Sequence, residues 1–187
     1  MLVVKSSKGC PRAAFFCYHL LATLLWLTSW SAHAQQNVYL PNPKLTPGAV
    51  DPAITPHNIQ ATVCVKGYTA SVRPDKRVTN QLKREQMRQY RYADANPQHY
   101  EEDHLIPLNI GGSPTDPQNL WPQPREGVWG ADQKNDLEFV AYKMVCNGEL
   151  SLLEAQRRIA HNWIEAYQAW VPSHQHLLPK GRRERAD

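Results

Sequence analysis

The stretch YEEDHLIPLNIGGSPTDPQNLWP, residues 100–122, decides the fold of this chain. Two short segments, 99–108 and 119–122, contain apolar residues and a proline, and the loop between them is rich in turn-forming residues. This pattern predicts two short strands around a glycine-bearing loop, arranged as a hairpin-like unit. The adjacent acid and base Asp103 and His104 lie at the end of the first segment, where a purely structural strand has no need of them.

Helical spacing of apolar residues appears on both sides of this unit. Residues 78–92 form one expected helix, and residues 131–148 form a second one that Gly148 terminates. Residues 151–170 give the clearest pattern, with Ser151 as N-cap of a capping box. Its apolar face is expected to contain Leu152, Ala155, Ile159, Trp163, Ala166 and Trp170. Residues 61–74, rich in valine and threonine, predict a short strand or an irregular segment.

The N-terminal segment has the pattern of a secretory signal peptide. Basic residues open the chain, an apolar run covers residues 13–30, and Ala32 and Ala34 form a small-residue cleavage site. A retained membrane anchor is the alternative, because the apolar run approaches the length of about 20 residues that a membrane span requires. We expect cleavage after Ala34, so that residues 1–34 are removed and the protein is exported to the periplasm or secreted.

The remainder is long enough for one domain of α+β class. Residues 35–58 hold five prolines and predict an extended lead-in, either laid over the domain or disordered. Residues 59–171 form the expected domain, and the polar, basic residues 172–187 a flexible tail. The chain has a formal net charge of +4, and removing the three basic residues of the signal segment leaves about +1. Net charge alone therefore does not indicate a nucleic-acid-binding protein.

Two cysteines, Cys64 and Cys146, remain after the predicted cleavage. In an exported protein two thiols most simply form one disulfide bond. Two buried free thiols are the alternative, whereas two cysteines without C-x-x-C spacing do not predict a zinc site.

The order strand, Asp-His, loop, Asn, strand, loop, helix resembles the HNH endonucleases of the His-Me finger group, which share a ββα-metal unit. The residues that carry the resemblance are DHLIPLNIGG (103–112), NLWP (119–122) and GADQKNDLE (130–138). Residues 64–170 are more loosely similar to secreted or periplasmic members of this group. The resemblance implies a ββα-metal finger packed against additional helices.

The chemistry of phosphodiester hydrolysis explains why such residues are needed. A histidine with an ordinary pKa near 6.5 is neutral at pH 7 and can take a proton from the attacking water. In an extended segment adjacent side chains point to opposite sides. The resemblance implies that His104 faces the water, that Asp103 binds the metal, and that Asn119 braces the finger or orients His104. A turn-favouring asparagine at a strand start is the alternative for Asn119.

The third position of the family pattern differs in this chain. Where relatives carry a histidine or asparagine as second metal ligand, residues 130–138 contain no histidine. Asp132 lies at that position and Asn135 follows one turn later, so either can supply an oxygen ligand beside Asp103. Oxygen ligands favour one divalent ion such as Mg²⁺ or Mn²⁺ over Zn²⁺. A role for Asp132 in capping the helix is the competing interpretation.

Two cations near this unit are candidate phosphate contacts. Lys134 is placed first, because a lysine early in this helix recurs in the family that the chain resembles, and Arg125 lies in the preceding loop. Both are equally compatible with solvated surface charges.

We therefore expect a metal-dependent endonuclease that hydrolyses phosphodiester bonds in nucleic acid, with DNA as the expected substrate and low sequence specificity. Two alternatives remain open: a nucleic-acid-binding module that does not cleave, and a structural or interaction protein of the cell envelope. The mature form is expected to bind no membrane, and the sequence does not identify a protein inhibitor.

Overall fold

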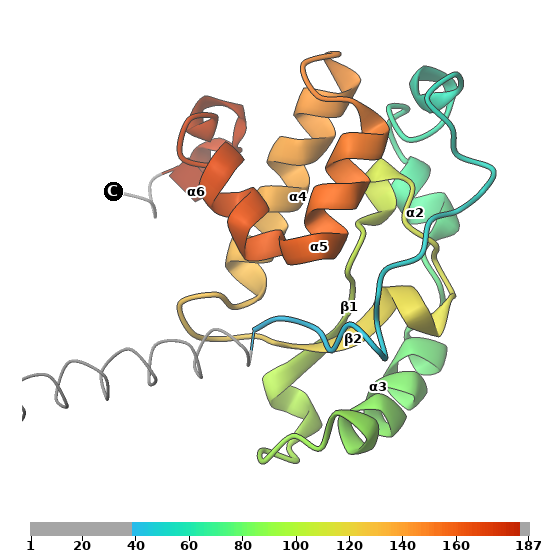
Figure 1. The fold of residues 1–187 in the computed structure, drawn as a ribbon, viewed down its shortest axis with the longest axis vertical. Coiled ribbons are helices and arrows are strands. Elements are labelled where there is room, and N and C mark those ends of the chain that lie inside the picture. The colour runs from blue at the N-terminus through green and yellow to red at the C-terminus, as the bar shows by residue number, and fades with distance from the viewer. Residues whose placement is uncertain (1–38, 184–187) are drawn as a thin grey trace, which may run out of the picture. The chain divides into compact units, whose positions relative to one another are not determined.

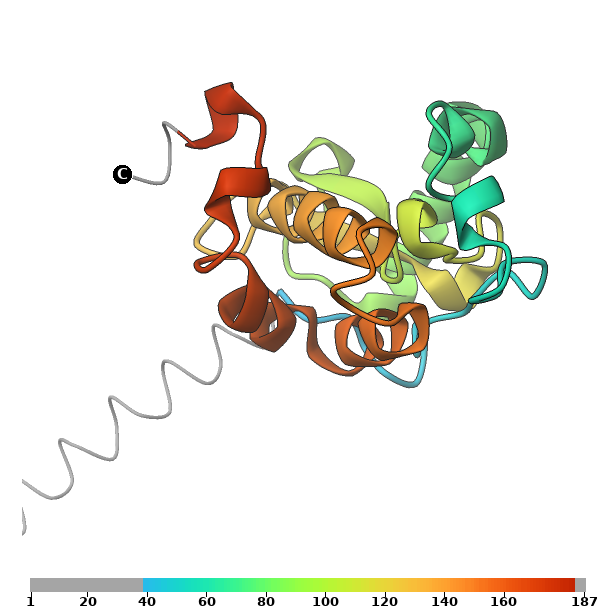
Figure 2. The same ribbon diagram turned by 90° about the horizontal axis from the view of Figure 1, so that it is seen from above.

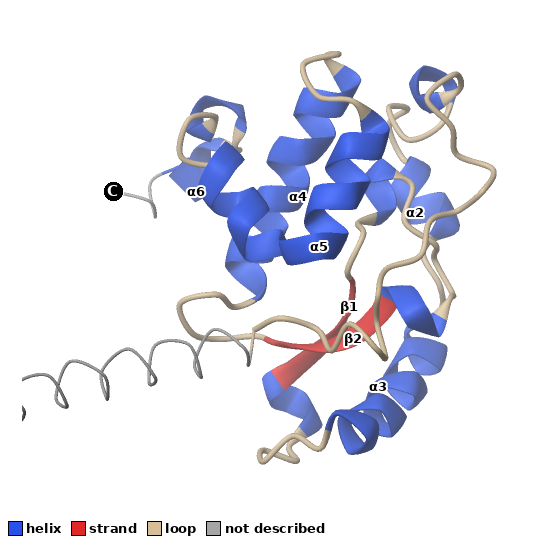
Figure 3. Cartoon of the chain, viewed as in Figure 1, coloured by secondary structure: helices blue, strands red, loops and turns tan. Residues whose placement is uncertain are grey.

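The computed structural model describes residues 39–183, and the predicted signal segment 1–34 lies outside this range. The described chain mixes helices with one small sheet, as expected for the α+β class (Figure 3). Strands β1 (Tyr100–His104) and β2 (Leu120–Pro124) pair antiparallel, with Asp103 opposite Trp121 and His104 opposite Leu120. The hairpin predicted from the opening stretch is therefore confirmed.

Helices make up most of the remaining structure. The α-helices are α2 (Tyr68–Val72), α3 (Lys76–Tyr90), α4 (Ala131–Cys146), α5 (Leu152–Trp170) and α6 (Lys180–Arg183). Short 3₁₀ turns are η1 (Ile59–Ala61), η2 (Pro97–His99), η3 (Leu108–Ile110), η4 (Pro117–Asn119) and η5 (Gln175–Leu177). No helix within residues 39–183 is both long enough and apolar enough to cross a membrane.

The hairpin lies between two groups of helices. Helices α4 and α5 pack side by side above it, and α3 packs on the other side of both strands (Figures 1 and 2). Trp121 of β2 enters the core between the hairpin and the helix pair, where it is fully buried. The core of the domain thus forms around the strand that follows the glycine-bearing loop.

The α5 periodicity read from the sequence matches the buried face. Its six predicted apolar residues, Leu152, Ala155, Ile159, Trp163, Ala166 and Trp170, are all buried. The Ser151 hydroxyl accepts a hydrogen bond from the Glu154 amide (3.2 Å), as expected for its N-cap. The helix is kinked at Asn162, whose backbone is extended and whose Oδ1 accepts from the amides of Ile164 and Glu165. Asn162 therefore restarts the helix by capping its second half.

The proline-rich lead-in lies over the hairpin loop. The Thr46 hydroxyl donates to the Leu120 carbonyl (3.0 Å), the Gly48 amide donates to Gln118, and Val50 forms an isolated bridge with Gly112. The segment forms no regular secondary structure of its own, so these bonds to the hairpin loop satisfy part of its backbone. Of the two possibilities left open for this segment, residues 39–58 follow the first.

Two segments differ from expectation. Residues 61–74 contain no strand; Gly67, with φ of 92°, begins the short helix α2 instead, because glycine alone takes this conformation without strain. The tail is structured as far as residue 183: Leu178 is buried, and the Arg182 guanidinium pairs with Asp136 (2.6 Å). The polar, basic composition of the tail predicted flexibility, but burial of the apolar Leu178 attaches it to the domain.

Cys64 and Cys146 form the expected disulfide bond, with their Cα atoms 5.7 Å apart. The bond connects the segment before α2 to the last residue of α4 across 82 positions of sequence. It therefore fixes the position of α2, which forms one wall of the pocket described below.

We expect replacement of both cysteines, Cys64→Ser with Cys146→Ser, to lower the free energy of unfolding by about 4–5 kcal/mol. The reason is that closing so long a loop restricts the unfolded chain, on the loop-entropy account. Urea denaturation of both proteins under oxidising conditions measures the difference. A loss below about 1 kcal/mol would contradict this expectation.

Candidate functional site

A polar pocket of about 240 Å³ lies beside β1. Strand β1 has its partner β2 on one edge, and in the described residues the sheet has two strands, so the other edge of β1 faces this pocket. The walls come from α2, β1, η3 and α4, with Arg73, Asp103, His104, Asn109, Asn135 and Glu138 among the lining residues. Residues distant in the sequence thus meet at the end of the strand.

Asp103 and His104 are the last two residues of β1, and adjacent side chains in a regular strand point to opposite faces. Both nevertheless line the same pocket. This is possible because the pocket lies at the open edge of the strand, so that side chains from both faces border it. Asn135, in the first turns of α4, lines the pocket as well.

The His104 ring is held in one orientation. Its Nε2 lies 3.0 Å from the Pro114 carbonyl oxygen, which can only accept, so Nε2 carries the proton and donates. Burial lowers the pKa of His104 below its ordinary value of 6.5, although the bond to Pro114 and the charge of Asp103 oppose this shift. The imidazole is therefore neutral at pH 7. Its Nδ1 has no hydrogen-bond partner among residues 39–183 and carries the free lone pair.

Asn119 is fully buried and holds the loop that carries the Pro114 carbonyl. Its Oδ1 accepts from the Ile106 amide (2.9 Å), and its Nδ2 donates to the carbonyls of Ile106 (3.0 Å) and Ser113 (2.9 Å). Ser113 precedes Pro114, so Asn119 fixes the acceptor of the His104 ring without touching the ring itself. A bracing role for Asn119 in catalysis stays a prediction.

The second glycine of the loop, Gly112, lies where there is no room for a side chain. A Cβ atom at this position would lie 1.8 Å from the Ile106 carbonyl oxygen and 2.9 Å from Asn119 Nδ2. Any side chain would therefore separate Asn119 from the loop that it holds.

Lys134 lies in the interior and does not lie where the predicted phosphate contact requires it. Its side chain is 1 % exposed, and its Nζ donates to Asp103 Oδ2 (3.1 Å), the His104 carbonyl (2.9 Å) and Glu138 Oε1 (2.7 Å). Burial acts to lower the pKa of Lys134, but the charges of Asp103 and Glu138 outweigh it and raise the pKa. Lys134 is thus a charged brace between α4 and the end of β1.

Glu138 was not identified from the sequence as a site residue. Burial raises the pKa of its carboxyl group from an ordinary value of 4.5 to about 7, the charge of Asp103 adds to the shift, and Lys134 opposes it. A helical pattern offers a signal for this residue, because Glu138 follows Lys134 by four positions and Asn135 by three and shares their face.

The two alternatives for the second metal ligand occupy different positions. Asn135 lines the pocket with Asp103, whereas Asp132 is exposed and is not among the pocket-lining residues. Asp132 lies in the first turn of α4, where its charge complements the helix dipole. Of the two alternatives, Asp132 at the family's ligand position and Asn135 one turn later, the pocket lining favours Asn135 as the candidate ligand.

Two arginines border the acidic side chains of the site. Arg125, predicted as a phosphate contact, is exposed and pairs with Glu101 (2.8 Å). Arg73, the C-cap residue of α2, lines the pocket directly, and its side chain has no ion pair among residues 39–183. The sequence offers no signal for Arg73, because the disulfide and the packing of α2 bring it across from a distant part of the chain.

Oxygen-bearing side chains make up much of the pocket lining. Both carboxylate oxygens of Glu102 and the Oδ1 of Asn109 are buried and have no hydrogen-bond partner. Asn109 lines the pocket with Asp103 and Asn135, and amide and carboxylate oxygens are the ligand type that Mg²⁺ and Mn²⁺ prefer, whereas burial raises the pKa of Glu102 and keeps its carboxyl group protonated. Counting only His, Cys, Asp and Glu, no group of three within residues 39–183 has a metal-binding arrangement. The proposed set differs because it uses amide oxygens.

Comparisons with family models, with curated proteins and with solved structures each returned no match to this chain.

Glu102 generates a prediction about stability and pH. Burial raises the pKa of this carboxyl group in the folded protein to about 8, from an ordinary value of 4.5. The folded state therefore binds more protons than the unfolded state between these values, so this group makes stability fall as pH rises. Glu102→Gln removes this titrating group. We therefore expect the free energy of unfolding of the variant, relative to that of the parent, to increase by roughly 2–4 kcal/mol as the pH is raised from below 4.5 to above 8.

Urea denaturation across this pH range, with EDTA present, measures the difference. The exposed Glu85 of α3 provides the control Glu85→Gln, for which we expect no such trend. Parallel stability curves for Glu102→Gln and the parent protein would contradict the assignment of a buried, protonated Glu102.

Proposed function

We propose that this chain is a metal-dependent endonuclease of the HNH type, which hydrolyses phosphodiester bonds in DNA with low sequence specificity. The order of β1, glycine-bearing loop, β2 and α4 supports a ββα-metal finger. The positions of the motif residues support it too, because Asp103, His104 and Asn135 line one pocket and Asn119 holds its loop.

One observation carries the proposal: His104 is a buried, neutral imidazole whose proton lies on Nε2 and whose Nδ1 is free. A general base must be unprotonated at the working pH and must present a lone pair to the proton that it removes. A structural histidine has no such requirement, and it would ordinarily use both ring nitrogens in hydrogen bonds when buried.

The reaction follows from these positions. Nδ1 of His104 takes a proton from a water molecule, whose oxygen attacks phosphorus in line as the bond to the leaving oxygen breaks. The positive charge that develops on the ring is stabilised by the bond from Nε2 to the Pro114 carbonyl and by the nearby Asp103. The Arg73 guanidinium, on the pocket wall, binds a non-bridging phosphate oxygen. The leaving oxygen takes its proton from solvent.

Asp103 and Asn135 are the residues that would hold a divalent ion. Lys134 binds Oδ2 of Asp103, which leaves Oδ1 for the ion. A bound Mg²⁺ or Mn²⁺ supplies charge neutralisation at the phosphate and at the leaving oxygen.

One observation favours the non-cleaving alternative. The Lys134 ammonium already lies between Asp103 and Glu138, and it neutralises part of the charge that a divalent ion would bind. A chain that used this lysine in place of the ion would keep the fold and lose the activity. The cleavage assays below distinguish the two functions.

Export is part of the proposal. The Cys64–Cys146 disulfide is typical of oxidising compartments, and it agrees with the signal segment expected at residues 1–34. An exported nuclease degrades foreign nucleic acid without reaching the chromosome of its own cell.

We expect His104→Ala to lower the rate of plasmid cleavage by about 10²- to 10⁴-fold, because the general base is lost. The assay incubates supercoiled plasmid with purified protein and Mg²⁺ or Mn²⁺, and EDTA should abolish cleavage by the parent protein. His161→Ala, at an exposed position of α5, is the matched control and should cleave at the parent rate. Equal cleavage by His104→Ala and the parent would reject His104 as the base.

The choice of metal ligand is tested by a pair of variants on the same helix. Asn135→Ala should lower the cleavage rate at least about 10-fold and shift the half-saturating Mn²⁺ concentration upward, because one oxygen ligand is lost. Asp132→Ala should leave both quantities close to those of the parent, since its side chain lies outside the pocket. The reverse result would return the ligand role to Asp132.

A further inference from the structure

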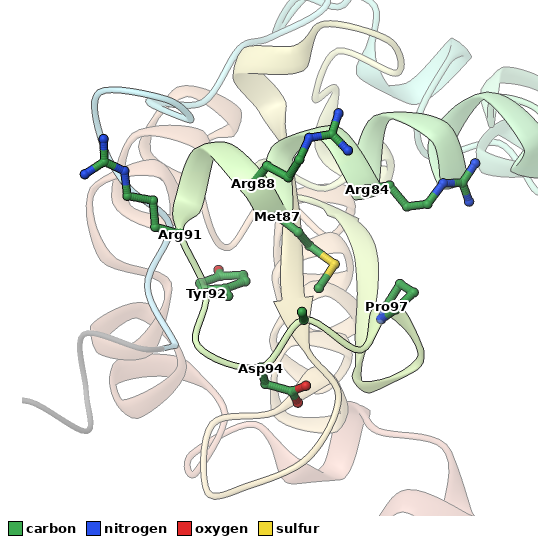
Figure 4. Close-up of a pocket in the computed structure, with 8 residues that line it drawn as sticks. Arg84, Met87, Arg88, Arg91, Tyr92, Asp94 and Pro97 are labelled. Carbon is green, nitrogen blue, oxygen red and sulfur yellow. The ribbon is translucent and has the colours of Figure 1, made fainter.

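A second cavity lies beside the C-terminal half of α3, where the chain leaves the helix and returns toward β1 (Figure 4). Its volume is about 330 Å³, and its apolar lining comes from Met87, Tyr92, Ala95 and Pro97. This size lies near the lower end of the range of about 300–1,000 Å³ for small-molecule sites. Nothing in the proposed reaction uses this cavity.

Three arginines form the rim of the cavity. Arg84 and Arg88 lie one turn apart on α3, Arg91 is the C-cap residue that follows the helix, and all three are exposed. Their guanidinium groups have no hydrogen bond or ion pair with any residue of the described chain. The one acidic residue at the cavity, Asp94, is already paired with His99. The rim therefore carries an excess of positive charge.

The arrangement of the arginines indicates the form of the ligand. Figure 4 shows the Arg91 side chain extending to the opposite side from those of Arg84 and Arg88, so that the three guanidinium groups are spread along the rim and do not surround one point. From Arg84 to Arg91 the helix rises by about 10 Å, at 1.5 Å per residue. Such a row suits a chain of regularly spaced anions better than one isolated anionic group.

The backbone at Arg91 gives independent support. Arg91 ends α3 in the left-handed conformation, with φ of 54°, and it is the one non-glycine residue with positive φ in residues 39–183. Glycine is the usual residue at such a position, because a side chain is strained there. An arginine at this position keeps a positive charge at the rim where glycine would fit the backbone better.

We propose that the cavity and its arginine rim bind a single strand of nucleic acid, with backbone phosphates on Arg84, Arg88 and Arg91 and one base on Met87 and Pro97. Guanidinium groups bind phosphate oxygens well, and a base offers the flat apolar face that this lining requires. An acidic peptide would use the rim but leave the apolar lining without a partner. This inference extends the proposed function, because α3 begins just after Arg73 and leads from the first pocket to this cavity.

Binding is measured without cleavage, so the result is independent of nuclease activity. Fluorescence anisotropy with a labelled oligothymidylate, in EDTA and on the His104→Ala background, gives the affinity as a function of salt. We expect the triple variant Arg84→Gln, Arg88→Gln, Arg91→Gln to bind at least about 10-fold more weakly at low salt. The slope of log K against log salt should become less steep by about 2, since three phosphate contacts on a single strand are lost.

A matched control removes three other exposed positive charges: Lys44→Gln, Lys66→Gln and Lys180→Gln. Equal losses in both triple variants would show that only net charge matters and would overturn the proposal. Arg91→Gly provides a test that is safe for folding, because glycine relieves the backbone strain. It should unfold at a higher temperature than the parent while it binds the oligonucleotide more weakly.

The base contact is tested with an abasic oligonucleotide of equal length. The parent should prefer oligothymidylate by about 5- to 100-fold, the usual effect of one stacked base. Ala95→Phe, which fills the cavity from an exposed position, should remove this preference and retain binding to the abasic strand. Equal binding of both strands by the parent overturns the base contact, and equally tight binding of oligoglutamate overturns the choice of nucleic acid.

Discussion

The Nζ atom of Lys134 donates hydrogen bonds to Asp103, to Glu138 and to the carbonyl of His104. A buried ammonium is costly by several kcal/mol unless charged and polar partners surround it, and here three acceptors do. The result is a fixed connection between α4 and the last two residues of β1. It adds a polar connection to the core packing of α4 and sets the distance from Lys134 to Asp103 at the site itself.

Asn119 supplies the second constraint, and it acts on the loop. Its amide group binds the backbone at Ile106 and Ser113, so the Pro114 carbonyl is held against the His104 ring. Gly112 permits this close approach because it has no Cβ. Lys134 therefore fixes the strand, Asn119 fixes the loop, and the imidazole between them has one tautomer and one orientation. Such preorganisation is a general requirement for acid–base catalysis.

Local patterns were sufficient for the hairpin, for helices α3, α4 and α5 and for part of the site, but not for α2 or the structured tail. Turn-forming residues between two short apolar segments predicted the hairpin, and helical spacing predicted the buried face of α5, because these features depend on neighbours in the sequence. Lys134 was expected at a phosphate from the family resemblance, or in solvent as an ordinary surface lysine, and its burial could not be foreseen because it depends on two carboxylates brought together by the fold. Arg73 could not be identified as a pocket residue from the sequence, because its helix is positioned by a disulfide bond between cysteines that are 82 residues apart. The kink at Asn162 could not be predicted either, because the apolar residues of α5 keep helical spacing on both sides of it.

The central claim is that Asp103, His104 and Asn135 form one site for a divalent ion and a phosphodiester. A crystal of the protein soaked in Mn²⁺ tests it most directly, because manganese is located by its anomalous scattering. The account predicts one peak in the pocket beside β1, within bonding distance of oxygen atoms of Asp103 and Asn135, and near the free Nδ1 of His104. A well-occupied peak elsewhere, or none in this pocket, would contradict it.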